Sequence, residues 1–235
     1  MEKVRFLVVV SGHNCSAYVK GCLDSIKAQT YTNYDVSIQD DASTDGTIDL
    51  IRENALPSWS YGQHYERSGM VMCRDFQVKV KEGFDVIVWV DMDDQLEPNA
   101  LERVAKEYED KDCWLTMGSW SASNGFKYTP EFMDIPFRYQ DLQFTHLRTF
   151  KKELYRHLTK EDLYPEHREI YPDANMLYCL LELAGIEHIR IIPDIIYRYN
   201  TNNPLSVIRR FTPEQRADEL SFIKSLPPKQ KLNSL

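Results

Sequence analysis

The sequence lacks any apolar run that approaches the ~20 residues needed to cross a bilayer, and its N-terminus has no basic segment followed by a long apolar one. We therefore expect a cytoplasmic protein with no transmembrane segment. An excess of basic charge is also lacking, because 28 Lys and Arg against 36 Asp and Glu give a formal net charge of −8. This balance argues against broad nucleic-acid binding.

Cysteine is scarce and irregularly placed. The five cysteines are odd in number and nowhere form Cys-x-x-Cys, so the sequence indicates neither a disulfide framework nor a zinc site. Buried free thiols in a reducing compartment are the simplest interpretation. What the chain does have is 43% hydrophobic residues over 235 positions, enough for the core of one substantial α/β domain.

The central stretch is residues 86–98. Residues 86–90 are apolar and rich in β-branched side chains, which is typical of a strand buried on both faces, and Asp91, Asp93 and Asp94 follow it. Side chains at i and i+2 share a face of an extended chain, so Asp91 and Asp93 are expected to point together. Their repulsion favours a hard divalent cation between them, Mn²⁺ or Mg²⁺. The sequence therefore predicts a metal on Asp91 and Asp93, with a solvated acidic turn as the plainer alternative.

Strands and helices alternate from the N-terminus onward. Phe6 to Val10 and Tyr34 to Ile38 are predicted strands, each followed by a helix, and polar stretches leave them at residues 11–14 and 39–47. This order predicts parallel strands with right-handed crossovers, whose ligands lie at the carboxyl ends of the strands. Both polar stretches are expected at that edge.

Two stretches lack periodicity. Residues 55–69 are predicted to be a loop, and residues 118–145 either a binding loop or a hairpin that the pattern does not reveal. The other elements of the second half are predicted as helices at 150–158 and 172–184, strands at 186–192 and 195–199, and a last helix after a capping box at Thr212.

The polar stretches and the acidic stretch resemble motifs of the family-2 glycosyltransferases of the GT-A fold. Residues 11–14 resemble the exit of that family's first strand, with His13 where Tyr is common. Residues 39–47 are close to the family's Asp-Asp-Gly-Ser-x-Asp-Gly-Thr, with Ala42 in place of Gly. Residues 91–98 match Asp-x-Asp-Asp-x-x-x-Pro in spacing.

A fourth motif strengthens the resemblance. Residues 69–74 resemble the family's Gly-x-x-x-Ala-Arg-Asn helix, although Cys73 and Asp75 depart from it. Four motifs in the right order are far more specific than any one of them. The processive members' Gln-x-x-Arg-Trp motif is absent.

The resemblance implies an α/β fold of the GT-A type, a Rossmann-like, mostly parallel sheet flanked by helices. Residues 1–117 would be the nucleotide-sugar-binding half, and residues 118–235 the acceptor-binding half with the C-terminal helix, in one continuous domain. The implied activity is inverting, metal-dependent transfer of a sugar from a nucleotide-diphosphate donor, with UDP favoured, to a glycan or other hydroxyl acceptor. A small, soluble, non-processive enzyme is expected.

The resemblance also assigns the donor contacts. Asp41 would accept a hydrogen bond from the base, Arg74 would reach base or phosphate, and a metal on Asp93 would neutralise the departing diphosphate. The full set of expected donor contacts is Ser11, Asn14, Asp41, Arg74, Asp91 and Asp94.

Inversion by single displacement needs one carboxylate to take the proton of the acceptor hydroxyl. The family keeps this acid at the start of a helix after the middle of the chain, which points to Asp173. A helix-dipole acid would look identical in sequence, and Glu166, Glu169 and Asp162 are the other candidates. His146 is a further possible metal or phosphate contact.

Three other functions compete. A sugar nucleotidyltransferase would need a Gly-rich, Arg-containing loop after the first strand, which residues 11–14 do not provide. An aspartyl-phosphate phosphatase carries Asp-x-Asp after its first strand, whereas here it follows the third. A binding protein that kept the fold without catalysis is disfavoured because every carboxylate that the chemistry needs is retained.

Overall fold

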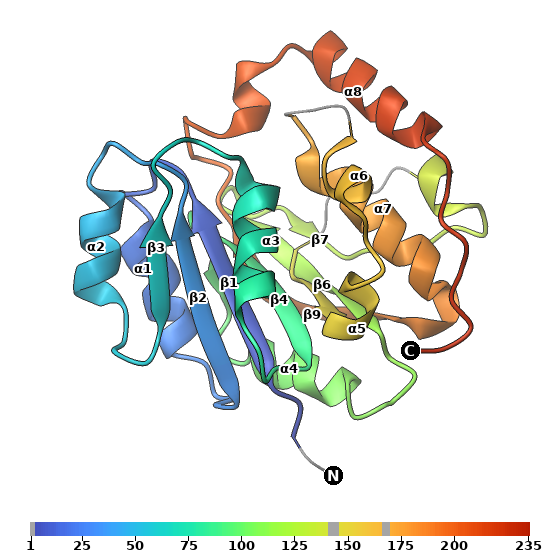
Figure 1. Ribbon diagram of the computed structural model, residues 1–235, viewed down its shortest axis with the longest axis horizontal. Helices are drawn as coiled ribbons and strands as arrows, with labels where there is room; N and C mark the ends of the chain where they lie inside the picture. The colour runs from blue at the N-terminus through green and yellow to red at the C-terminus, as the bar shows by residue number, and fades with distance from the viewer. Residues whose placement is uncertain (1–2, 141–145, 166–169) are drawn as a thin grey trace.

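The computed structural model describes residues 3–140, 146–165 and 170–235, built around a nine-stranded mixed sheet with strand order β3-β2-β1-β4-β8-β6-β9-β5 and β7 paired to β6 (Figure 1). The strands are β1 (Phe6–Gly12), β2 (Tyr34–Asp40), β3 (Ser60–Gln63), β4 (Val86–Asp91), β5 (Gln95–Leu96), β6 (Leu115–Ala122), β7 (Lys127–Tyr128), β8 (Arg148–Lys151) and β9 (Ile189–Tyr199). The helices are α1 (Val19–Lys27), α2 (Thr47–Asn54), α3 (Met70–Val80), α4 (Ala100–Glu107), α5 (Lys152–Tyr155), α6 (Lys160–Leu163), α7 (Pro172–Ala184) and α8 (Pro213–Ser225), with 3₁₀ turns at Phe137–Tyr139, Ile186–His188 and Val207–Arg210.

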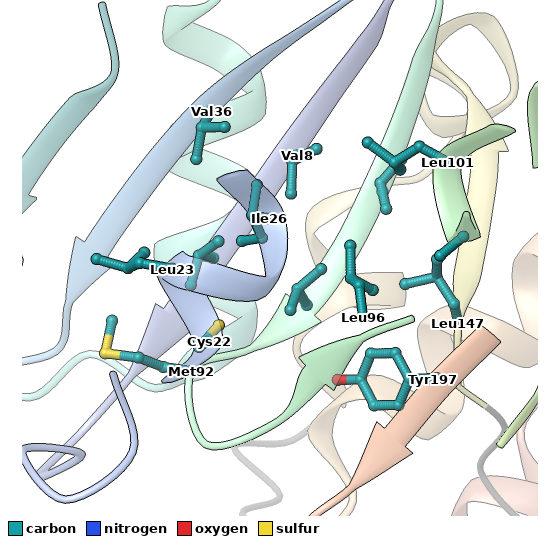
Figure 2. Close-up of a cluster of buried hydrophobic side chains, with 14 of the residues drawn as sticks. Val8, Cys22, Leu23, Ile26, Val36, Met92, Leu96, Leu101, Leu147 and Tyr197 are labelled. Atoms are coloured by element: carbon teal, nitrogen blue, oxygen red, sulfur yellow. The ribbon is translucent and has the colours of Figure 1, made fainter. Parts of the chain in front are cut away.

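The side chains of β1 alternate between two hydrophobic layers, as the period of a strand requires. Val8 and Val10 pack into one cluster with α1 and α4, shown in Figure 2, whereas Leu7 and Val9 pack into a second cluster with α3 and α7. Figure 1 shows α3 and α7 over the same face of the sheet. The neighbouring strand β4 divides in the same way, with Val88 in the first cluster and Trp89 in the second, so the strand predicted at residues 86–90 is confirmed as buried on both faces, between two layers of helices.

The strand register brings the two predicted polar stretches, residues 11–14 and 39–47, to one edge of the sheet. Ser11 of β1 lies opposite Gln39 of the parallel strand β2 and opposite Asp91 of the parallel strand β4. The carboxyl ends of these three strands therefore meet, as the alternation of strands and helices predicts. No described helix is both long and apolar enough for a membrane span, and all five cysteines are buried and free.

Several local predictions need correction. Residues 55–69 contain a strand, β3, which pairs with β2. Phe150 lies in strand β8, opposite Ile87 and Leu115, rather than at the start of a helix; the helix-favouring residues that follow it form only the short α5. The two strands predicted at 186–192 and 195–199 are one strand, β9, interrupted by a register shift where Pro193 and Asp194 intervene.

The irregular stretch after residue 117 begins with a hairpin. Strand β6 continues to Ala122 and pairs with β7, so the hairpin expected as one alternative is present. The helix predicted at residues 172–184 and the capping box at Thr212 are both confirmed, because the side chain of Thr212 accepts a hydrogen bond from the backbone N–H of Gln215.

Candidate active site

Asp41 lies directly after β2 and is held by the loop that precedes α3. Its carboxylate accepts hydrogen bonds from the backbone N–H groups of Ser68 (2.8 Å) and Gly69 (3.0 Å) and from the Ser68 hydroxyl (3.1 Å). Burial raises the pKa of Asp41, but these donors outweigh it and hold the pKa below its usual value. Asp41 is therefore ionised and oriented by backbone amides.

Asn14 connects the polar stretch after β1, residues 11–14, to the polar stretch after β2, residues 39–47. Its backbone has a φ of 53°, in the left-handed region that Asn tolerates. The Asn14 backbone N–H donates to the Ser43 hydroxyl at 2.7 Å, and its side-chain oxygen accepts from the backbone N–H of Thr44 at 2.9 Å. Asn14 thus fixes the loop that carries Asp41.

Arg74 joins β1 to the acidic stretch. It points from α3 across the sheet edge, is 2% exposed, and donates from Nε to the Ser11 hydroxyl at 2.9 Å and from its other end to Asp91. Its guanidinium also lies 4.6 Å from the centre of the Trp89 ring. Ser11, Arg74 and Asp91 therefore form one connected group.

The three acids of the exit of β4 have different environments. Burial raises the pKa of Asp91, but Arg74, His146 and Arg148 together lower it to about 2. For Asp93, burial and the charge of Asp91 raise the pKa to about 6. The acids repel one another as the sequence predicts.

Asp94 is 1% exposed, and its pKa is raised well above its usual value by burial and by Asp93. Its two oxygens accept hydrogen bonds from the Tyr197 hydroxyl and from the backbone N–H of Asn200, both at 2.7 Å. The carboxyl of Asp94 therefore ties the acidic stretch to the end of β9.

His146 adds a nitrogen to this group. Asp91, Asp94 and His146 each offer one possible ligand atom, a carboxylate oxygen or a ring nitrogen, and these three atoms lie within 4.8 Å of one another. Such a set of donors suits a divalent cation. Burial lowers the pKa of His146 to about 4, so the ring is neutral and free to ligate. The grouped residues differ from the predicted pair, because Asp93 is outside this set and instead accepts a hydrogen bond from Asn203 at 2.7 Å.

Asp173 lies in the first turn of α7. It forms an ion pair with Arg148 of β8, which is 2% exposed and, like Arg74, lies against Trp89. Burial raises the pKa of Asp173, but Arg148 keeps it below the usual value. Asp173 and Asp91 are thus linked through two arginines, because Arg148 and Arg74 pair with one carboxylate each and both lie against Trp89.

The other candidate acids stand apart or outside the described residues. Asp162 caps α6 with Thr159 and pairs with Lys229 at 2.6 Å. Glu166 and Glu169 lie outside the described residues. No role was predicted from the sequence for Arg148, Tyr197 and Asn203, which the structure brings to these acids. A charged residue among the otherwise uncharged residues 147–150 was the available signal for Arg148.

A second set of possible metal ligands lies beside Asp41. Asp41, His64 and Cys73 each offer one possible ligand atom, and these three atoms lie within 4.8 Å of one another. The Ser68 hydroxyl already lies among them, 2.6 Å from Nδ1 of His64 and 3.5 Å from the Cys73 sulfur. Burial raises the pKa of Cys73 to about 12, so this set is explained as a hydrogen-bonded cluster around Asp41.

The sequence and fold are similar to those of known glycosyltransferases. The model of the family "Glycosyl transferase family 2" matches residues 7–164. Chondroitin synthase of Pasteurella multocida is 30% identical over 202 residues, which cover 79% of this chain and 20% of that protein. The putative glycosyltransferase EpsH of Bacillus subtilis is 28% identical over 144 residues, 60% of this chain and 41% of EpsH. The chain thus spans less than half the length of these relatives.

Two solved structures share the fold. S. aureus TarS 1-349 in complex with UDP has a TM-score of 0.71 and 19% identity, covering 94% of this chain and 64% of that one. The mannosyltransferase PcManGT from Pyrobaculum calidifontis, in complex with GDP-Man and Mn²⁺, has a TM-score of 0.70 and 19% identity, covering 97% and 66%. The predicted GT-A fold is confirmed.

Proposed function

The chain belongs to glycosyl transferase family 2, and from this premise we propose that it is an inverting, metal-dependent glycosyltransferase that moves a sugar from a UDP-sugar to a hydroxyl of a glycan or similar acceptor. The observation that carries the proposal is that Asp41, Arg74 and Asp91 meet at the carboxyl edge of the sheet, with Asp173 linked to them through Arg148 and Trp89. Ligands of open α/β sheets bind at this edge.

The donor nucleotide would lie along the exits of β1 and β2. Asp41 is an ionised acceptor, which matches the N–H of a uracil ring, and UDP is the nucleotide bound in the TarS complex. Arg74 supplies a buried positive charge between Ser11 and Asp91 that suits the ribose or diphosphate. Asn14 would act by fixing the loop around Asp41.

The residues at the exit of β4 fit a divalent cation, Mn²⁺ or Mg²⁺. Asp91, Asp94 and His146 offer ligand atoms close together. The pKa of Asp93 is raised by burial and by the charge of Asp91, so a nearby cation would stabilise the ionised form of its carboxylate. Mn²⁺ is present in the PcManGT complex. When bound, such an ion would act as a Lewis acid on the leaving diphosphate. We include Asp93 as a further ligand of this metal ion. Asp91 would bind the metal ion while it also pairs with Arg74.

Asp173 would act as the general base. It is ionised, and it pairs at the head of α7 with Arg148, whose charge also lowers the pKa of Asp91. From there it would take the proton of the acceptor hydroxyl as that oxygen attacks the sugar carbon opposite the departing diphosphate. Residues 1–117 would then bind the donor and residues 118–235 the acceptor.

The proposal is tested by thermal shift with UDP, GDP, CDP and ADP, each with and without Mn²⁺, followed by hydrolysis of radiolabelled UDP-sugars. We expect the largest stabilisation from UDP with Mn²⁺, and hydrolysis that stops when the metal is chelated. Equal stabilisation by all four nucleotides without metal, and no hydrolysis, would contradict it.

A further inference from the structure

Asp41, His64 and Cys73 bring a carboxylate, an imidazole and a thiol together from three separate elements. Asp41 follows β2, His64 follows β3, and Cys73 lies in the first turn of α3. Nδ1 of His64 lies 3.5 Å from Oδ1 of Asp41 and 3.6 Å from the sulfur of Cys73. The backbone N–H of His64 donates to the carbonyl oxygen of Asp40 at 2.9 Å, so the sheet itself fixes the position of this histidine.

These separations match those of a tetrahedral zinc site. Zn–N and Zn–O bonds are about 2.0 Å and Zn–S bonds about 2.3 Å, which places tetrahedral ligand atoms about 3.3–3.6 Å apart. The remaining pair, Asp41 and Cys73, has its ligand atoms within 4.8 Å. The carboxylate of Asp41 is also oriented from behind, because its second oxygen accepts from the backbone N–H of Gly69 at 3.0 Å.

The hydroxyl of Ser68 lies among the three ligand atoms. It is 2.6 Å from Nδ1 of His64, 3.1 Å from Oδ1 of Asp41 and 3.5 Å from the sulfur of Cys73. One small polar atom therefore contacts all three side chains at once. Ser68 is exposed, so its hydroxyl can turn towards solvent and leave this place to an ion. The side chain of His64 is 23% exposed, which gives the ion a path from solvent.

We propose that Asp41, His64 and Cys73 form a second metal site, selective for Zn²⁺, and that zinc bound there inhibits binding of the nucleotide donor. A thiolate is a soft ligand that favours Zn²⁺ over Mn²⁺ and Mg²⁺, whereas the carboxylates after β4 suit the hard ions. When zinc binds, the thiol of Cys73 releases its proton to solvent as the Zn–S bond forms. A water molecule would complete the fourth position.

The environment of Cys73 makes this site a reversible one. Burial raises the pKa of its thiol to about 12, so zinc has to displace a tightly held proton. This cost lowers the affinity below that of a structural zinc site with readily ionised thiols. Without zinc, the same side chains are held by the hydrogen bonds of the cluster around Asp41. The fold therefore does not depend on the ion, and occupancy follows the concentration of free zinc.

The inhibition rests on the proposed function, in which the carboxylate of Asp41 accepts a hydrogen bond from uracil. Zinc on Oδ1 of Asp41 would take the electron pair that the base needs, so zinc and UDP exclude each other. Such coupling is reciprocal, because zinc raises the Kd of UDP by the factor by which UDP raises that of zinc. At free zinc ten times its own Kd, the apparent Kd of UDP should rise about tenfold.

The site is tested first without nucleotide, by titrating the reduced protein with Co²⁺ as a spectroscopic substitute for zinc. Mg²⁺ is present throughout to fill the site after β4. Cobalt bound by a thiolate shows a charge-transfer band that carboxylate and imidazole ligands do not give. The test variants are Cys73→Ala and His64→Ala. The matched controls are Cys113→Ala, another buried free thiol, and His157→Ala, an exposed histidine; neither belongs to a group of possible ligands among the described residues.

We expect the wild type to show the thiolate band with one equivalent of Co²⁺ and to lose it when Zn²⁺ is added. Cys73→Ala should show no band, and His64→Ala should bind at least about tenfold more weakly, since losing a ligand costs no less than losing a residue that orients one. Both controls should behave like the wild type. Absence of the band from the wild type, or its persistence in Cys73→Ala, would overturn the site. Melting temperatures without metal show that each variant is folded, and His64→Ala tests the site independently of the buried position.

The inhibition is tested by calorimetry of UDP with saturating Mn²⁺, at increasing free Zn²⁺. The Kd of UDP should rise about tenfold in the wild type and in Cys113→Ala, but less than twofold in Cys73→Ala. Equal inhibition of Cys73→Ala would place the effect of zinc at the Mn²⁺ site and overturn the proposed competition. If UDP does not bind even without zinc, the proposed donor is wrong, whereas the zinc site still stands or falls on the cobalt spectrum.

Discussion

The side-chain amide of Asn203 donates a hydrogen bond of 2.7 Å to Asp93, across 110 residues of sequence. A second link runs in parallel, because the Tyr197 hydroxyl accepts from the backbone N–H of Asp91 at 3.1 Å and donates to Asp94 at 2.7 Å. Figure 2 shows Tyr197 beside Leu96, in the buried cluster. The geometry of the acidic stretch therefore depends on β9 and the residues that follow it as well as on β4.

Replacing Asn203 by Ala should weaken Mn²⁺ binding, because Asp93 loses the partner that orients it. Residues that orient metal ligands typically contribute about 10-fold to 100-fold in affinity. Titration with Mn²⁺, followed by water-proton relaxation, measures the effect directly. Asn99→Ala, which removes an exposed amide, is the matched control. It should bind Mn²⁺ like the wild type, and an Asn203→Ala affinity within twofold of that control would show that Asn203 does not position the metal ligand.

Replacing Asp93 by Ala should abolish metal-dependent donor binding, because the proposed site loses one of its carboxylates. The measurement is the Kd of UDP by calorimetry, with Mn²⁺ and again after chelation. In the wild type the two values should differ, whereas in the variant they should coincide. Undiminished UDP binding and turnover by metal-stripped Asp93→Ala would count decisively against the proposed metal site.

The acidic stretch itself was predictable from sequence, since an apolar β-branched run followed by acids has a local pattern. Among its partners, His146 was named from the sequence as a possible metal contact, and the structure places it with Asp91 and Asp94. Tyr197 and Asn203 were not named, because they reach the stretch from 103 and 110 residues away and share no spacing with it. The helical prediction for residues 150–158 shows the same limit. Helix-favouring residues follow Phe150, and only pairing with β4 and β6 makes residues 148–151 a strand.

Replacing Ala42 by Gly should stabilise the fold. Ala42 has a φ of 59°, in the region that costs a non-glycine residue ~1–2 kcal/mol, and glycine's greater freedom in the unfolded chain offsets about 0.5–1 kcal/mol of the gain. We expect a net increase of ~0.5–1 kcal/mol in the free energy of unfolding by urea. Ala55→Gly, at a φ of −68°, should instead lose stability. A loss in both variants would contradict the strain at Ala42.

Replacing Asp173 by Asn should slow sugar transfer by ~10²–10⁴-fold while UDP binding survives, if Asp173 is the general base. Asparagine keeps the size and much of the hydrogen bonding of aspartate but cannot take a proton. Turnover, UDP affinity and melting temperature are measured on the same preparation. A purely structural role would make the variant melt earlier and make its activity follow the folded fraction.

The ion pair with Arg148 makes a second variant necessary, because Asp173→Asn leaves a guanidinium that is 2% exposed without its countercharge. Removing one partner of a buried pair is destabilising, whereas removing both charges is often tolerated. The double variant Arg148→Gln/Asp173→Asn should therefore recover stability. If Asp173 is the base, the double variant stays inactive. If it only neutralises Arg148, activity returns with stability, and the base would have to be sought elsewhere, with Glu169 the next candidate.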